Sequence, residues 1–325
     1  MANPLRWGIL GTGRMCRRVA AAIHTVGDVV TIVGSREAHR AQEVAGAVGA
    51  ARGGLYEDVL AAADVEVIYV ALPNRLHAPW TVRAAEAGKH VFCEKPLAAT
   101  VEECETMVAA CDRHGVHLVE AFMYRYHPQW QVVWRVVESG RLGRLRLLRA
   151  AFGFHLRGEG NIRLVPELDG GALQDVGCYC VNVARWFLGE PQRVRGVSAD
   201  LRGVGVDTHN SAILEFASGA QALLECSFET ASHQVVEIIG EQGRIEVPVA
   251  FVTTGETRVR IVDDDGDRVE VVSPADSYAL EVAAVGRLIR EGVPTLTPGD
   301  DAIRTQTVLA AWRAASTEGI VPLPS

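Results

Sequence analysis

Residues 5–13 read LRWGILGTG, an apolar run that meets two glycines just before a stretch with helical spacing of apolar residues. A glycine turn between a strand and a helix is the setting that a dinucleotide-binding fingerprint requires. Gly11 permits the tight turn, Gly13 lets a pyrophosphate approach the backbone, and the following helix offers its amide N–H groups. The third glycine position holds Cys16, which is still small enough for close packing. The predicted cofactor contacts here are Gly11, Thr12, Gly13, Arg14 and Met15.

The chain up to about residue 120 alternates short apolar runs with helical periodicity, the pattern of strand–helix–strand units in a parallel sheet. Thr100 precedes one of the helices, with Glu103 three positions later, which matches a capping box. We therefore predict an α/β Rossmann domain with a doubly wound parallel sheet over residues 1–122. Its expected strands lie near residues 5–10, 29–35, 66–72, 90–93 and 116–120, and its expected helices are Arg14–His24, Ala38–Val48, Ala78–Ala87 and Val101–His114.

From about residue 123 the pattern changes to a helix, Pro128–Ser139, followed by strands in which apolar and polar residues alternate. Glycine turns such as Ser218-Gly219 separate several of these strands. Two helices, near Ser277–Glu291 and Asp300–Ser316, end the chain. We predict an α+β domain over residues 123–325 with a largely antiparallel open sheet.

The composition is that of an ordinary globular chain, since 48% of its 325 residues are hydrophobic and 22% are charged. The length favours two domains over one. A net charge of −8 without a block of Lys or Arg argues against nucleic acid and anionic membrane as partners. Because no run of about 18 apolar residues and no signal-peptide pattern occurs, we expect a cytoplasmic protein without a membrane span.

The seven cysteines form an odd set without the paired spacing of a zinc site. We expect reduced, mostly buried thiols, and no bound metal. These cysteines are Cys16, Cys93, Cys104, Cys111, Cys178, Cys180 and Cys226.

Cofactor choice depends on the end of the second strand, where a carboxylate would bind the ribose hydroxyls of NAD. This strand ends in Gly34-Ser35-Arg36 instead. Ser35 can donate to a 2′-phosphate, and Arg36 can pair with it or stack on the adenine. NADP is therefore favoured over NAD, although Glu37 could still serve the ribose.

Two segments carry candidate catalytic residues. Glu94-Lys95-Pro96 follows the fourth strand, at the sheet edge where doubly wound folds bind ligands. Asp175 and Tyr179 are four residues apart in a predicted helix that follows Gly170-Gly171, so they share a face. Oxidation of an alcohol requires removal of the hydroxyl proton, and a tyrosine becomes a sufficient base when a cation stabilises its phenolate. Lys95 is a plausible cation, and Asp175 could hold a substrate hydroxyl or restrain the other two.

These residues resemble the glucose-fructose oxidoreductase, inositol dehydrogenase and rhizopine catabolism (Gfo/Idh/MocA) family over essentially the whole chain. Glu-Lys-Pro at this distance from the glycines is the most specific part of the match. The segment Ala121–Pro128 further resembles the branch with D-xylose dehydrogenases and dimeric dihydrodiol dehydrogenases, and so does tyrosine at position 179. The matching motifs are Gly11-Thr12-Gly13, Ala71-Leu72-Pro73-Asn74 through His77, Glu94-Lys95-Pro96 and Asp175-x-Gly177-x-Tyr179.

The resemblance implies Lys95 and Tyr179 as the catalytic pair, with Asp175 beside them. It also implies that the open sheet of the C-terminal domain pairs subunits, so we expect a homodimer or homotetramer. The further cofactor contacts that it implies are Leu72, Pro73, Asn74, His77, Glu94, Lys95 and Arg125. The substrate-side residues that it implies are Lys95, Phe154, Arg157, Asn161, Arg163, Asp175 and Tyr179.

The leading functional hypothesis is an NADP-dependent oxidoreductase that moves a hydride between the nicotinamide and a sugar or related cyclic polyol. An alternative is a reductase of nucleotide-linked keto sugars, for which Arg157 and Arg163 would bind a diphosphate. A third hypothesis is a non-catalytic dinucleotide-sensing regulator, which would not need both Lys95 and Tyr179.

Overall fold

The computed structural model describes residues 3–158 and 160–324, which form two compact units. Unit 1 runs to Tyr126 and also takes in Asp276–Ile303. Unit 2 contains His127–Ala275 and the chain from Arg304 onwards. The sequence pattern had placed Asp276–Ile303 in the second domain, because an amphipathic helix does not itself reveal which core it covers.

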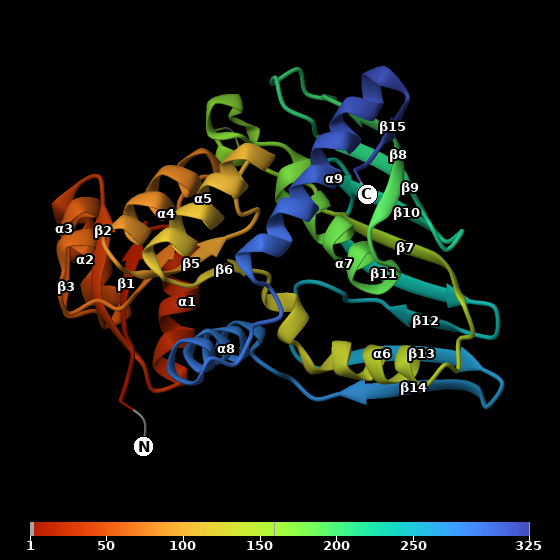
Figure 1. Ribbon diagram of the computed structural model, residues 1–325, viewed down its shortest axis with the longest axis horizontal. Coiled ribbons are helices and arrows are strands. Elements are labelled where there is room, and N and C mark those ends of the chain that lie inside the picture. Colours follow the sequence, from red (N-terminus) through yellow and green to blue (C-terminus); the bar gives the residue numbers. More distant parts are fainter. Residues whose placement is uncertain (1–2, 159, 325) are drawn as a thin grey trace. The chain divides into compact units, whose positions relative to one another are not determined.

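Unit 1 is built on a parallel six-stranded sheet in the order β3-β2-β1-β4-β5-β6 (Figure 1). This order, which reverses at β1, is that of doubly wound dinucleotide-binding folds and confirms the predicted fold class. All four residues of β4 are buried, as expected for a sheet covered on both faces. The strands are β1 (Arg6–Leu10), β2 (Val29–Ser35), β3 (Arg52–Leu55), β4 (Val67–Val70), β5 (His90–Glu94) and β6 (Leu118–Ala121).

The helices of unit 1 cover both faces of this sheet. One face packs a core that includes Trp7 and Phe92 against α1 and α8, and the other packs Ile68 and Cys93 against α4 and α5. Thr100 caps α5 by accepting a hydrogen bond from the amide of Glu103 at 3.2 Å. The helical segments are α1 (Arg14–Thr25), α2 (Ala38–Val48), α3 (Tyr56–Ala61), η1 (Asn74–Leu76), α4 (His77–Glu86), α5 (Val101–His114), η2 (Met123–Tyr126) and α8 (Ser277–Glu291).

Unit 2 contains a nine-stranded sheet in the order β14-β13-β12-β11-β7-β10-β9-β8-β15. Among the described residues β7 and β10 run parallel and the other pairs are antiparallel, which confirms the largely antiparallel prediction. Its strands are β7 (Leu145–Gly153), β8 (Pro191–Ala199), β9 (His209–Phe216), β10 (Gln221–Ser227), β11 (His233–Gly240), β12 (Arg244–Val247), β13 (Thr257–Asp263), β14 (Gly266–Val272) and β15 (Ile320–Pro322).

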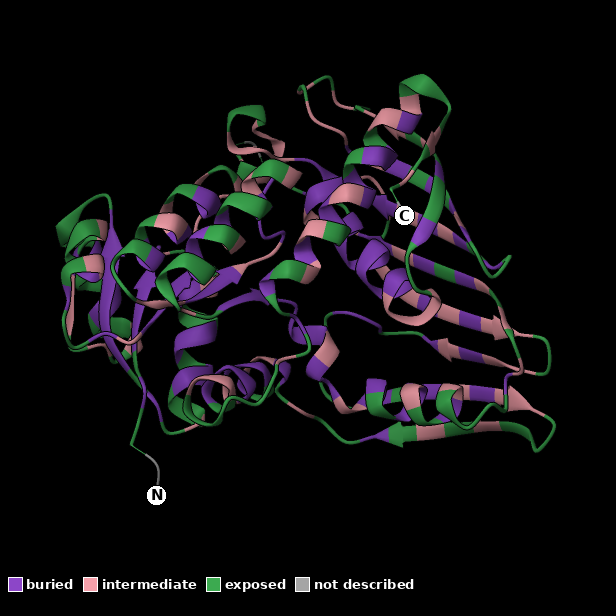
Figure 2. Ribbon diagram, in the orientation of Figure 1, coloured by how far each residue is buried: buried purple, intermediate pink, exposed green. Residues whose placement is uncertain are grey.

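Helices pack on one face of this second sheet, α6 (Pro128–Glu138) on β13 and β14, and α7 (Cys178–Leu188) on β7 and β10. Buried positions alternate with less buried ones along the strands of this sheet (Figure 2). In β9, for example, buried Leu214 follows exposed Ile213. The chain returns from unit 1 to unit 2 within α9 (Gly299–Glu318). In the part of the chain that the structure describes, no helix combines the length and apolarity of a membrane span.

Candidate active site

The glycine turn joins β1 to α1 in unit 1. Gly11 has φ of 115°, and a Cβ there would overlap the carbonyl oxygen of Ala71, so this position requires glycine. Gly13 is the N-cap of α1, and a Cβ built on it meets no atom within 4 Å. No side chain of the described residues caps this helix end. Its N–H groups therefore fit the pyrophosphate of a dinucleotide.

Cys16 occupies the third glycine position and is fully buried in the core beside the sheet. Burial raises the pKa of its thiol to about 11, which keeps it protonated at neutral pH. Cys16 thus fills the third glycine position as a packing residue, and α1 still packs against the sheet.

Ser35 ends β2 and is buried, and its hydroxyl oxygen accepts a hydrogen bond from the amide of Glu37 at 3.4 Å. Arg36 is exposed, and its positive charge acts on the phenol of Tyr56. Glu37, the residue that could have favoured NAD, is also exposed, and its carboxylate lies 3.5 Å from His39. The end of β2 therefore presents a hydroxyl and a guanidinium.

Arg40 is a second cation at this end of the sheet, and the sequence motifs did not indicate it. Its Nε donates to the hydroxyl of Thr12 at 3.1 Å, so α2 is tied to the glycine turn. Its position four residues after Arg36 could have indicated a second cation for the 2′-phosphate. An exposed charge on a helix usually faces solvent only, however, so this spacing alone does not predict a binding residue.

His77 connects the loop after β4 to the Glu-Lys-Pro turn. Its ring is fully buried, and its two nitrogens lie 2.8 Å from the carbonyl oxygen of Leu72 and 2.9 Å from that of Pro96. Burial lowers the pKa of His77, so the neutral ring donates to one of these carbonyls. Because the side chain is buried, its contribution to cofactor binding would be to fix the loop at Leu72-Pro73-Asn74.

Lys95 directly follows β5, is half-buried, and is joined to Pro96 by a cis peptide bond. Its positive charge acts on His77 and on Tyr278 of α8. Glu94, the last residue of β5, accepts a hydrogen bond from the hydroxyl of Tyr69. The parallel sheet thus delivers a carboxylate and an amine together at its carboxyl edge.

Arg125 lies in η2 and is nearly buried, with 10% of its side chain exposed. Its guanidinium is 3.8 Å from the carboxylate of Asp301. If Arg125 contacts the cofactor, it does so with a guanidinium that the carboxylate of Asp301 already orients.

In unit 2, Asp175 lies in η5 (Leu173–Gly177), a turn of π-helix that leads directly into α7, which carries Tyr179. The sequence predicted one helix through both residues, but a π turn, a feature frequent at functional sites, separates them. Asp207, which no sequence motif indicated, holds the start of this segment by accepting a hydrogen bond from the amide of Leu173 at 2.7 Å. A Cβ on Gly171 would lie 2.5 Å from Asp207, which explains the glycine.

Tyr179 is packed among aromatic rings, and 5% of it is exposed. Its ring centroid is 5.3 Å from that of Phe152 and 5.3 Å from that of Phe251. Phe154 continues this row, 6.4 Å from Phe152. The ring of Tyr179 is therefore fixed between two other aromatic rings.

Asp175 forms an ion pair with Arg163, with 2.6 Å between Oδ2 and Nε. Asn161 supports the arginine by accepting a hydrogen bond from its amide at 3.1 Å. Arg157 is exposed and makes no hydrogen bond or ion pair with another described residue. Thus three predicted residues, Asn161, Arg163 and Asp175, are brought together, and Arg157 is not among them.

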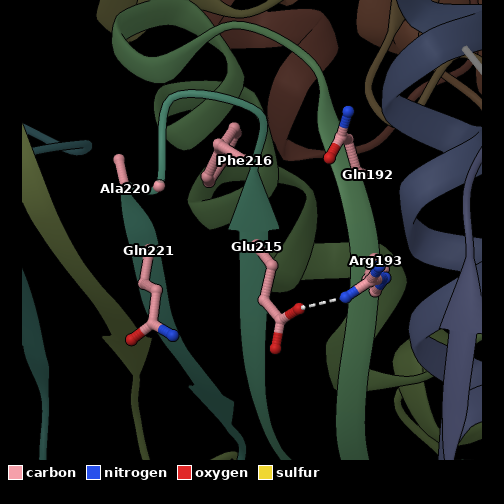
Figure 3. A pocket seen from close by; sticks show the side chains of 7 residues that line it. Gln192, Arg193, Glu215, Phe216, Ala220 and Gln221 are labelled. Atoms are coloured by element: carbon pink, nitrogen blue, oxygen red, sulfur yellow. Dashed lines mark hydrogen bonds and ion pairs between the residues drawn. The ribbon is translucent and has the colours of Figure 1, made fainter.

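A separate pocket of about 190 Å³ lies on unit 2 at the β9–β10 turn (Figure 3). It is lined by Arg193 and Glu215, which are 3.5 Å apart, and contains none of the predicted site residues. No group of three or more His, Cys, Asp or Glu among the described residues is arranged to hold a metal ion.

Two family descriptions match the chain. Residues 5–122 match the oxidoreductase family with an NAD-binding Rossmann fold, and residues 130–246 match the GFO/IDH/MocA C-terminal domain. The chain is 37% identical to D-xylose 1-dehydrogenase (NADP(+)) 2 of Haloferax volcanii, over 98% of this chain and all of that protein.

Two solved structures are similar over nearly the whole chain. A 3-ketoreductase from Actinomadura kijaniata in complex with NADP and TDP-benzene is 30% identical, with a TM-score of 0.91, over 96% of this chain and 98% of that one. An aldose-aldose oxidoreductase from Caulobacter crescentus, complexed with glycerol, is 28% identical, also with a TM-score of 0.91, over 99% of this chain and 100% of that one.

Proposed function

Because this chain belongs to the Gfo/Idh/MocA family of oxidoreductases, we propose that it is an NADP-dependent dehydrogenase or reductase of a sugar or related cyclic polyol. The observation that carries this proposal is the likeness over the full length to an NADP-dependent D-xylose dehydrogenase, joined with Lys95 and Tyr179 at the matching motifs. When bound, NADP supplies the hydride acceptor or donor at C4 of its nicotinamide.

The cofactor proposal is supported by the charges around the end of β2. Ser35, Arg36 and Arg40 present a hydroxyl and two cations to a 2′-phosphate, which a carboxylate in place of Ser35 would repel. The open end of α1 would take the pyrophosphate.

In the proposed chemistry Tyr179 moves the proton of the reacting hydroxyl, since its ring is the one in this row of rings that carries a hydroxyl group. Lys95 supplies the positive charge that stabilises the phenolate, because an unassisted phenol with a pKa near 10 is too weak a base. Asp175 holds a substrate hydroxyl, and its ion pair with Arg163 fixes the position of the carboxylate.

The substrate is proposed to be a free sugar rather than a nucleotide-linked one. A diphosphate would need Arg163 as a cation, but Asp175 already neutralises that guanidinium at 2.6 Å. Reduction of a nucleotide-linked keto sugar remains a second candidate, because Arg157 is exposed without an ion-pair partner among the described residues. The sensor hypothesis is not adopted, since both Lys95 and Tyr179 are present.

The test is an absorbance assay at the NADPH band with pentoses, hexoses, inositols and a nucleotide-linked keto sugar, each with NADP(H) or NAD(H). We expect turnover of a free sugar with NADP. Arg40→Ala should raise the KM for NADP by about tenfold or more, because one charge-assisted hydrogen bond to the 2′-phosphate is lost, and should raise that for NAD much less, through the lost bond to Thr12. Turnover of the nucleotide-linked sugar alone would contradict the proposal of a free sugar as substrate. Equal effects of Arg40→Ala on the KM values for NADP and NAD would contradict the proposed 2′-phosphate contact.

The partner that we propose for the uncovered face of the second sheet is a second copy of this chain. That face carries exposed apolar residues, Val197 and Ile213, next to ion pairs such as Arg149–Glu237 at 3.0 Å. Mixed apolar and paired charged surface suits a self-complementary interface. We expect sedimentation to give a dimer or tetramer and Ile213→Asp to give a smaller species; a monomeric wild type would overturn this proposal.

A further inference from the structure

The loop between β8 and β9, residues 200–208, contacts both segments of unit 2 that carry proposed substrate-side residues, yet none of the proposed steps uses it. Its Arg202 donates from Nη2 to the carbonyl oxygens of Leu156 at 2.9 Å and of Phe228 at 3.1 Å. The same guanidinium pairs with the carboxylate of Glu229, at 2.6 Å from Nε. The loop is therefore fixed to the segment that follows β7 and to the end of β10.

Asp207, near the end of this loop, is held by the sheet. Its Oδ2 accepts a hydrogen bond at 2.7 Å from the side-chain amide of Asn210, a fully buried residue of β9. The next residue, Thr208, is also fully buried. Its amide donates to the carbonyl of Ala199 at 2.8 Å, and its own carbonyl accepts from the amide of Phe228 at 2.8 Å. Asp207 is therefore fixed both through its carboxylate and through the backbone that follows it.

The carboxylate of Asp207 caps the π turn η5 from another part of the chain. The turn begins after Ala172, whose methyl group cannot accept a hydrogen bond. Oδ2 of Asp207 accepts from the amide of Leu173 at 2.7 Å, and the backbone carbonyl of Asp207 accepts from the amide of Ala172 at 2.9 Å. A Cβ on Gly171 would lie 2.5 Å from Oδ1, so this glycine leaves room for the aspartate. Three successive residues are thus fitted to Asp207.

The segment that Asp207 holds also fixes Asp175 and Arg163. Asp175 is the third residue of η5, and its amide donates to the carbonyl of Gly171 at 3.1 Å. The amide of Gly171 donates in turn to the carbonyl of Arg163 at 2.9 Å, and the side chain of Arg163 pairs with Asp175 at 2.6 Å. Asp175 is thus two residues from the amide that Asp207 fixes, within the same turn.

We propose that Asp207 is a positioning residue for Asp175: as the cap of the π turn, it sets where the proposed substrate-binding carboxylate lies. Such turns are rare and short, so contacts from outside the turn matter for keeping one in place. Without the bond from Asp207 the turn would relax and move Asp175, and a shift of about 1 Å in a positioned group can lower an enzyme's rate by about 10². This inference rests on the proposed role of Asp175, but its first test needs no sugar.

The first test is hydrogen exchange of peptides that cover residues 171–176, read by mass spectrometry without cofactor or sugar. Asp207→Ala should increase the exchange rate of this segment by about tenfold or more, because the amide of Leu173 loses a hydrogen bond to a carboxylate. Asp200→Ala is the matched control, because this aspartate of the same loop accepts from amides of the loop itself, at 3.1 and 2.7 Å. The control should leave the exchange of residues 171–176 unchanged.

The second test is steady-state kinetics on the best sugar of the panel. We expect Asp207→Ala to raise the KM for the sugar about tenfold and to change the KM for NADP by less than about twofold, because the residues proposed to bind the adenosine end of NADP lie in unit 1. Asp207→Asn is nearly isosteric and keeps one oxygen that can accept from Leu173, so it should raise the KM for the sugar only about threefold. If Asp207→Ala does not fold, Asp207→Asn gives the same comparisons with smaller effects.

A double-mutant cycle shows whether Asp207 acts through Asp175. If it does, either substitution of Asp207 should lower kcat/KM for the sugar in the wild-type background, but by less than about twofold in an Asp175→Asn background. If the two residues act independently, their effects multiply instead.

The outcomes separate this inference from the proposed function. Unchanged exchange of residues 171–176 overturns the capping role of Asp207, whether or not a sugar is turned over. Faster exchange together with multiplying effects on kcat/KM overturns the positioning of Asp175. If no sugar of the panel is turned over, the proposed function fails, and the exchange rates alone decide whether Asp207 holds the turn.

Discussion

Replacing Tyr179 by phenylalanine is expected to lower kcat by about 10² or more, because this removes the proposed proton carrier and no other atom. The ring would keep its contacts with Phe152 and Phe251, each with its centroid 5.3 Å away. The affinity for NADP should not change, because the residues that we propose to contact the adenosine end of NADP lie in unit 1, whereas Tyr179 lies in unit 2. The defect should therefore appear in turnover and not in cofactor binding.

The measurement is steady-state kinetics on the best sugar of the panel, with the NADP dissociation constant from fluorescence titration. Tyr126→Phe is a matched control, because it removes another buried phenol hydroxyl, one that lies 3.2 Å from Thr297 Oγ1. The control should lower the melting temperature and keep kcat within about twofold of wild type. Turnover of Tyr179→Phe close to wild type would show that another group moves the proton.

Much of the fold was predictable because its strongest patterns are local. The helices α2, α5 and α8 begin and end at the residues that apolar periodicity and capping predicted, Ala38–Val48, Val101–His114 and Ser277–Glu291. The strand β3 and helix α3 were missed. β3 reads Arg-Gly-Gly-Leu and has little β propensity, and its Gly53 is required because a Cβ would overlap the backbone of Ala41 in α2.

The candidate site also contains parts that the sequence predicted and parts that it did not. The glycine turn and the Glu-Lys-Pro segment could be recognised because each is a short motif at the end of a strand. The ion pair Arg163–Asp175, by contrast, joins residues twelve apart through a loop and a π turn, and no periodicity predicts such a contact.

The amino-acid composition of the chain bears on the role of Lys95. The chain has 30 arginines and two lysines, so arginine supplies nearly every positive charge of its surface and ion pairs. Lysine therefore stands at position 95 in a protein that uses arginine at all its other cationic side chains except Lys89 and the histidines. The amine is a compact charge with three rotatable donors, whereas a guanidinium is planar, longer and does not lose its proton. This contrast indicates that position 95 needs an amine and not only a positive charge.

Lys95→Arg is accordingly expected to lower kcat by about 10² or more although the formal charge is retained. The bulkier group would have to fit beside the buried His77 and the Glu94 carboxylate, so it could not place its charge where the amine does. Lys89→Arg is the matched control: it changes the only other lysine, which bonds to two backbone carbonyls, and should lower the melting temperature without affecting kcat. If Lys95→Arg kept more than about a tenth of wild-type turnover, a positive charge alone would suffice at this position.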